Sequence, residues 1–235
     1  MDKSRFNSEV KSVSRPLFSA RAGRLSLWLA GAALALLAFV RITRELIEGD
    51  VGGVDNAILL AMARTHKPWL TIAAIDVTAL GSITLVVLFS AFTLVVLLVL
   101  RDWLGALQLL ATSAGAGILT LVTKDIIERA RPEQAQQLIV VSGFSYPSGH
   151  SLSTSALYLT IAIIASRYIR HSGARAAIFL AVSAVVLRVG ASRVYLGVHY
   201  ATDVVSGISL GSAWALMLAG FFTLFGHRGS CCAEP

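Results

Sequence analysis

The fold is decided by a stretch without a single charged side chain, Ser82-Ile-Thr-Leu-Val-Val-Leu-Phe-Ser-Ala-Phe-Thr-Leu-Val-Val-Leu-Leu-Val-Leu100. A helix of this length measures about 28 Å, close to the ~30 Å hydrocarbon core of a bilayer. Arg101 and Asp102 then make a hydrophilic turn before the next apolar run begins. Because a chain in lipid must satisfy its own backbone hydrogen bonds, the stretch predicts a membrane-spanning helix.

The composition of the whole chain agrees with a protein whose solvent is largely lipid. Hydrophobic residues make up 56% of the 235 residues, charged residues only 14%, and the mean hydropathy is +0.74. Soluble domains average about 25% charged residues. The net charge of +7 does not indicate nucleic-acid binding, because the basic residues flank apolar segments and do not gather on a recognition helix. Cys231 and Cys232 are adjacent and have no other cysteine to pair with, so we expect an inert exposed tail.

Five further apolar runs lead us to expect an all-α, polytopic membrane protein with a six-transmembrane-helix bundle. The first run follows basic residues, as a cleaved signal peptide also does, but its length and the later spans favour an anchor. We expect residues 1–24 to be a flexible cytoplasmic tail, 25–226 the six-helix domain and 227–235 a second cytoplasmic tail. The expected spans are 25–47, 82–100, 103–122, 147–167, 176–189 and 199–225.

A short amphipathic helix is expected between the first and second spans. Residues 56–67 carry Ile58, Leu59 and Met62 on one side, and we expect this helix to lie at the membrane interface. Pro68 and Trp69 are expected to close it, since tryptophan suits the headgroup zone.

The charges on the two sides of such a bundle predict its orientation. The tails and the turns at Arg101 and at 167–175 carry eleven Lys/Arg and four Asp/Glu, whereas the other side carries nine of each. The positive-inside rule therefore places both tails in the cytoplasm.

Three short polar blocks occupy the opposite, outward side. In the first block, Lys124 and Arg131 are seven residues apart, two helical turns, and would share one face if the third span continued to Pro132. Cations at a helix end often only reach for lipid headgroups. The alternative is phosphate binding, because arginine grips phosphate in a bidentate manner and lysine acts as a mobile point charge.

The second block, Pro147-Ser148-Gly149-His150, opens the fourth span. Proline and serine are ordinary helix starters, so the block has a purely structural explanation. It also offers Ser148 and the free N–H groups of a helix N-terminus to an anion, with His150 beside it.

The third block joins the last two spans. Arg193 and His199 flank a turn that contains Gly197, and Asp203 follows His199 at i+4, a spacing that stacks both side chains on one helix face. A lone histidine at an interface is more often structural, but an ionisable pair facing a bundle indicates function. A carboxylate on one ring nitrogen fixes the tautomer and leaves the other nitrogen free to attack.

Together the three blocks resemble the phosphatidic-acid phosphatase type 2 (PAP2) superfamily, whose pattern is K-x6-R-P, then P-S-G-H, then S-R-x5-H-x3-D. Each signature position is filled, over a region of resemblance from about residue 55 to 225. The residues are Lys124, Arg131, Pro132, Pro147, Ser148, Gly149, His150, Ser192, Arg193, His199 and Asp203.

The resemblance implies a hydrolase that works through a phosphohistidine. His199 would attack phosphorus, Asp203 would orient it, and His150 would protonate the leaving oxygen. The phosphate-binding residues would be Lys124, Arg131, Ser148, Gly149 and Arg193, with no metal or other cofactor, as is typical of the family.

Small bacterial relatives act on lipid phosphates, so the expected partners are a lipid phosphate substrate and membrane lipids, and no nucleic acid. The outward motifs imply an inner-membrane enzyme with a periplasmic active site, for which undecaprenyl diphosphate is the first-choice substrate. Phosphatidylglycerol phosphate, phosphatidic acid and lipid A phosphates are alternatives, as is a phosphotransferase with the same site. A non-catalytic lipid-binding or transport protein is disfavoured, because His199, His150 and Asp203 are all present.

Overall fold

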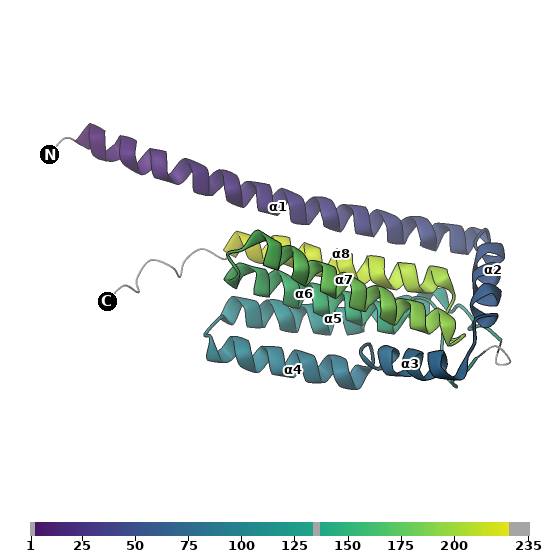
Figure 1. Ribbon diagram of the computed structural model, residues 1–235. Helices are drawn as coiled ribbons and strands as arrows, with labels where there is room; N and C mark the ends of the chain where they lie inside the picture. Colours follow the sequence, from purple (N-terminus) through teal and green to yellow (C-terminus); the bar gives the residue numbers. More distant parts are fainter. Residues whose placement is uncertain (1–2, 134–136, 226–235) are drawn as a thin grey trace.

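The computed structural model describes residues 3–133 and 137–225, with side chains from residue 22 onward. Over these residues the chain forms eight α-helices and no β-strand, which confirms the all-α prediction. The helices are α1 (Lys3–Glu48), α2 (Gly52–Ala63), α3 (Pro68–Ala79), α4 (Ile83–Val99), α5 (Trp103–Ile127), α6 (Gly149–Tyr168), α7 (Ser172–Tyr195) and α8 (Ala201–Phe225). Helices α4 to α8 run in roughly the same direction, and α1 lies along them at an angle and extends beyond the bundle (Figure 1). Helix α2 crosses the end of the bundle, and α3 continues into α4.

Polar caps begin three of the helices at the positions that the sequence suggests. The Ser82 hydroxyl accepts a hydrogen bond from the Leu85 N–H (3.3 Å), and the Asp102 carboxylate accepts one from the Gly105 N–H (2.8 Å). Ser148 caps α6 in the same manner through the Ser151 N–H (3.5 Å). Such caps satisfy donors that lack an intrahelical partner.

Four of the helices are long and apolar enough to cross a membrane by length and composition: α1 over Ala22–Glu48, α5, α7 and α8. The pair α3 and α4 qualifies together, with a bend of 44° between them. The expected count of six spans is therefore not confirmed on hydropathy, because α6 is not in this set. Helix α6 packs against α5, α7 and α8, and its buried residues include Ser151, Thr154, Ser155 and Thr160.

The segment between the first and second spans differs from the prediction. Helix α2 ends at Ala63, and Pro68, which was expected to close a helix over 56–67, instead occupies the first turn of α3. Proline lacks the N–H that a first turn leaves unpaired, so this position costs no hydrogen bond. The expected apolar side of Ile58, Leu59 and Met62 packs on Val194 and Val204, which belong to α7 and α8.

Helix α1 includes residues 3–24 of the expected N-terminal tail, and the division into tails and a central domain stays a prediction. The expected tail at 227–235, with Cys231 and Cys232, lies outside the described residues.

Helices α6 and α8 approach each other so closely that their backbones are in contact. A methyl group added at Gly211 would lie 2.3 Å from the Leu152 carbonyl oxygen, and one at Gly207 would lie 2.6 Å from the Ser148 carbonyl oxygen. Only glycine fits these two positions of α8. The contact fixes the start of α6 against the start of α8.

Substitution of Gly211 by alanine is expected to force α6 and α8 apart. Overpacking of this kind costs ~1–3 kcal/mol, so the detergent-solubilised Gly211→Ala variant should unfold at a lower temperature than wild type. Gly117→Ala is the matched control, because a methyl group there meets nothing within 4 Å. Equal melting temperatures for the two variants would show that the close approach is not a constraint.

Candidate active site

The three sequence blocks meet at one end of the bundle. The end of α5, the start of α6 and the turn between α7 and α8 all lie at the end of the bundle that α2 and α3 cover (Figure 1). The turns between α4 and α5 and between α6 and α7 lie at the opposite end. Residues that are far apart in the sequence thus share one surface of the bundle.

His199 and Asp203 are in contact, as their spacing predicts. The His199 Nδ1 lies 3.4 Å from the Asp203 Oδ2, and the two side chains are 2% and 0% exposed. His199 precedes α8, which begins at Ala201, so the expectation that both residues share a helix face is wrong. The turn before His199 brings them together instead, with Gly197 at φ 71°, a conformation that glycine adopts without strain.

The environment of His199 keeps its imidazole neutral at pH 7. Burial away from water lowers the pKa of His199 to about 4, with Arg193 and Arg131 acting in the same direction and Asp203 opposing them. A neutral ring whose Nδ1 faces a carboxylate carries a free electron pair on Nε2. That nitrogen can act as a nucleophile.

Arg131 lies directly beside this nitrogen. Its Nη1 is 3.3 Å from the His199 Nε2 and donates to the Val198 carbonyl (2.8 Å), while its Nε donates to the Gly143 carbonyl (2.9 Å). The expected shared helix face with Lys124 is wrong, because α5 ends at Ile127 and Glu128 turns the chain at φ 46°. Arg131 therefore reaches the site from the loop.

Lys124 lies in the last turn of α5, where its Nζ donates to the Phe144 carbonyl. Gly149 lies opposite α5, since a methyl group added there would be 3.2 Å from the Thr120 side chain. Lys124 and Gly149 both line one large cavity.

Ser148 and His150 stand at the start of α6, as predicted. The Ser148 N–H donates to the Asp203 carbonyl (3.0 Å), so this N–H is not free for an anion. The charged groups whose fields act on His150 are Arg193, Arg131, Lys124 and His199, so it faces the same cluster.

Arg193 is a buried cation with an incomplete set of hydrogen bonds. It is 3% exposed, and its Nη1 donates to the Thr78 hydroxyl of α3 (3.1 Å). Its Nε is buried without a hydrogen-bond partner within residues 3–133 and 137–225. Because a buried unpaired donor is costly, a bound anion is the natural partner of this group.

Four residues of the site were not predicted from the sequence. Arg129 donates to Asp203 and to Asp55 of α2, Ser145 donates to Asp203, and Thr202 donates to Asp55. The one signal in the sequence was Asp55, an ionisable residue in a short apolar helix.

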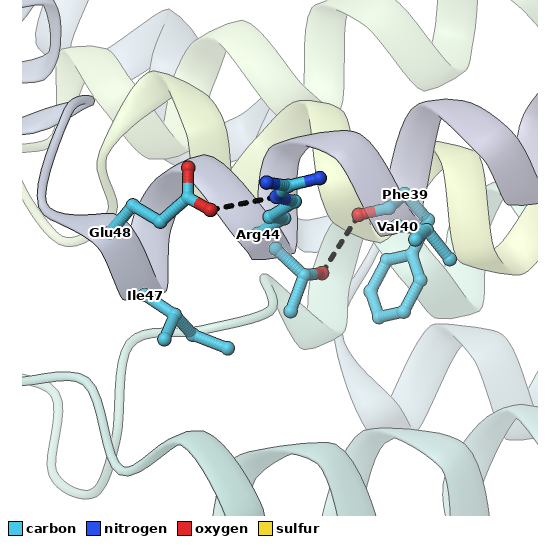
Figure 2. Close-up of a pocket in the computed structure, with 6 residues that line it drawn as sticks. Phe39, Val40, Arg44, Ile47 and Glu48 are labelled. Atoms are coloured by element: carbon cyan, nitrogen blue, oxygen red, sulfur yellow. Dashed lines mark hydrogen bonds and ion pairs between the residues drawn. The ribbon is translucent and has the colours of Figure 1, made fainter.

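An apolar cavity of about 680 Å³ extends from the site between α4, α5 and α6. Side chains such as Val86, Leu94 and Leu110 line most of it, and Lys124 and Gly149 line its polar end. A second hollow of about 300 Å³ lies along α1, beside the Arg44–Glu48 ion pair (Figure 2). The lining of this hollow includes none of the predicted site residues. The larger cavity is therefore the one connected with the site.

Comparison with known proteins identifies the arrangement. The model of the PAP2 superfamily matches residues 105–225. The chain is 32% identical over 194 residues to phosphatidylglycerophosphatase B of Bacillus subtilis (strain 168), which covers 79% of this chain and 91% of that protein. It is 32% identical over 134 residues to lipid A 1-phosphatase of Rhizobium johnstonii, which covers 53% of this chain and 50% of that protein.

The fold gives the same result. The crystal structure of a transmembrane PAP2 type phosphatidylglycerolphosphate phosphatase from Bacillus subtilis matches with a TM-score of 0.73 at 31% identity, over 81% of this chain and 94% of that one. The chain therefore belongs to the PAP2 superfamily and is one of its membrane-embedded phosphatases.

Proposed function

We propose that this protein hydrolyses the phosphate of a membrane lipid through a phosphohistidine on His199. The observation that carries the proposal is that one apolar cavity has Lys124 and Gly149 at its polar end. An apolar cavity with a lysine at one end fits an amphiphile with an anionic head. A water-soluble phosphate would leave that apolar surface uncovered.

The chemistry follows from the groups around His199. The Nε2 attacks phosphorus while the bond to the lipid oxygen breaks, and His150 gives that oxygen a proton. Water then attacks the phosphohistidine, His150 takes its proton, and inorganic phosphate leaves. Lys124, Arg131 and Arg193 hold the non-bridging oxygens with Ser148 and Gly149, and stabilise the charge of the transition state.

Phosphatidylglycerol phosphate is the first candidate substrate, because it is the one that the names of the relative from Bacillus subtilis and of the matching crystal structure point to. Undecaprenyl diphosphate, the first choice from the sequence, is the second candidate, and the outward position of the motifs favours it. A panel that also contains phosphatidic acid and lipid A tests both by the release of inorganic phosphate from purified protein. We expect activity in the presence of EDTA. Addition of a second lipid that can accept the phosphoryl group distinguishes phosphoryl transfer from hydrolysis.

We propose further that six spans cross the bacterial inner membrane, with α3 and α4 forming one span and α6 another. The buried polar side chains of α6 support its inclusion, since a helix enclosed by three others need not be apolar throughout. The charge difference between the two ends supports a periplasmic active site.

His199→Ala is expected to reduce phosphate release more than about 1000-fold, because it removes the attacking nitrogen. The wild type mixed with labelled substrate and quenched should carry an acid-labile, base-stable phosphoryl group that the variant lacks. His171→Ala is the control, since His171 is exposed in the turn between α6 and α7. Turnover of the His199→Ala variant within a few-fold of wild type would disprove the mechanism.

Gly117→Phe is expected to fill the apolar cavity, because Gly117 lines it and nothing lies within 4 Å of an added methyl group. Activity on long-chain lipid phosphates should fall about 10-fold or more, because the phenyl ring would occupy space that the lipid chain needs, while a short-chain substrate should react as with wild type. Ile118→Phe on the exposed side of the same helix is the control. An equal loss on both substrates would count against a lipid-binding role for the cavity.

The orientation is tested by cysteine labelling in a variant that lacks Cys231 and Cys232. A cysteine at Val140, which is 96% exposed, should react in intact cells with a thiol reagent that cannot cross the inner membrane. A cysteine at the exposed Ser172 should react only after the cells are broken. The reverse pattern would place the active site in the cytoplasm and remove the support for undecaprenyl diphosphate.

A further inference from the structure

Arg129 binds two buried carboxylates, each of which is 74 positions away from it in the sequence. Its Nη1 donates to the Asp203 Oδ1 (2.6 Å) and its Nη2 to the Asp55 Oδ2 (2.7 Å). The side chain of Arg129 is 13% exposed, whereas both carboxylates are 0% exposed. Its guanidinium carbon also lies 4.1 Å from the centre of the Tyr200 ring. The guanidinium is therefore in contact with Asp203, Asp55 and the Tyr200 ring.

Asp55 also binds the start of α8. Its Oδ1 accepts the Thr202 N–H (3.0 Å), and its Oδ2 accepts the Thr202 hydroxyl (2.5 Å). A carboxylate at a helix N-terminus accepts a hydrogen bond from an otherwise unpaired N–H and interacts favourably with the positive end of the helix dipole. Asp55 thus caps α8 from a different helix, next to the turn that carries His199.

The contacts of Arg129 differ from those of the cations assigned to the phosphate. Both terminal nitrogens of Arg129 are engaged by carboxylates, whereas the buried Nε of Arg193 has no partner among the described residues. Arg131 in turn lies 3.3 Å from the nucleophilic nitrogen of His199. Arg129 touches Asp203 on the side away from His199 Nδ1, since it binds Oδ1 while the imidazole faces Oδ2.

We propose that Asp55 and Arg129 are positioning residues, which hold the Asp203 carboxylate and the start of α8 so that His199 is oriented for attack. The inference rests on the proposed role of His199 as the nucleophile. The Oδ2 of the buried Asp203 carboxylate is held by Ser145, the Tyr200 N–H and His199, and Arg129 adds a contact to Oδ1 and a compensating positive charge. Asp55 keeps Arg129 in place and anchors the helix from which Asp203 projects.

The pair also affects the protonation of His199. The charged and titratable groups that face His199 are Asp203 from α8, Arg193 from α7, Arg131 from the loop and His150 from α6. If Arg129 is removed, the negative charge of Asp203 is less compensated, so the protonated imidazole becomes more favourable. As the pH falls, His199 then becomes protonated at a higher pH than in wild type, and the protonated ring is no longer a nucleophile.

The test is the double variant Asp55→Asn/Arg129→Gln, purified in the same detergent as wild type. It replaces an ion pair by two amides, so the net charge of the network with Asp203 is unchanged, while Asp203 loses its charged partner. We expect kcat to fall at least about 10-fold, toward the ~100-fold that a misplacement of about 1 Å can cost, with KM little changed. The acid limb of kcat/KM should move to higher pH. Arg129→Lys, which keeps the charge, should recover part of the loss in kcat.

The controls separate this inference from the proposed function. Arg44→Ala breaks the exposed Arg44–Glu48 pair (2.7 Å, Figure 2) and should leave kcat and the pH profile unchanged. If His199→Ala is inactive but the double variant has the kcat and pH profile of wild type, only the positioning role is wrong. If KM rises and kcat does not fall, Arg129 binds phosphate and the inference is overturned. If the double variant cannot be purified folded, Arg129→Lys decides alone. A wild-type kcat would overturn the inference, and a reduced kcat with an unchanged KM would support it.

Discussion

Asp203 carries a negative charge at 0% exposure, where no water can solvate it, so the protein must supply each compensating contact itself. The contacts come from the loop after α5 through Arg129 and Ser145, and from the turn before α8 through the Tyr200 N–H and the His199 ring. Compensation of one buried carboxylate therefore requires the loop after α5 and the turn before α8 to lie beside Asp203. The orientation of the His199 ring beside Asp203 depends on this assembly.

The bilayer imposes a second constraint, on where polar side chains can be placed. Helix α6 holds buried serine and threonine side chains, and several of them bond to carbonyls of their own helix or to a neighbouring helix. Enclosure by α5, α7 and α8 keeps these groups away from lipid. Helix α6, which begins at Gly149, is thus enclosed by three other helices, and this position limits how far its first turn can move.

The contacts of the site that the residues themselves predicted are those governed by short-range rules, whereas the grouping of the three blocks into one site came from the family resemblance. The Ser148 cap, the Gly197 turn and the contact of His199 with Asp203 each join residues within a few positions of one another. The ion pairs of Arg129 with Asp55 and Asp203 each join residues 74 positions apart, and no local pattern encodes such a pairing. Pro68 shows the limit of a local rule, because proline both follows helices and begins them, and only the packing of α3 on α7 decides between the two. A local rule also limits the count of six spans, because the buried serine and threonine side chains of α6 lower its hydropathy. Hydropathy alone therefore does not decide whether α6 spans the membrane.

The backbone contact between α6 and α8 has a consequence for how the substrate range of such an enzyme can change. Gly207 and Gly211 leave no room for a side chain, and Gly207 lies against the carbonyl of Ser148 itself, so the start of α6 and the first half of α8 are held close together. The cavity wall on α4 and α5 is built differently, with Gly117 facing open space. A mutant library aimed at new lipids should therefore randomise the wall between α4 and α5 and leave α6 and α8 untouched. Most of the cavity lining belongs to α4 and α5, outside the contact of α6 with α8, so these positions can change without disturbing that contact.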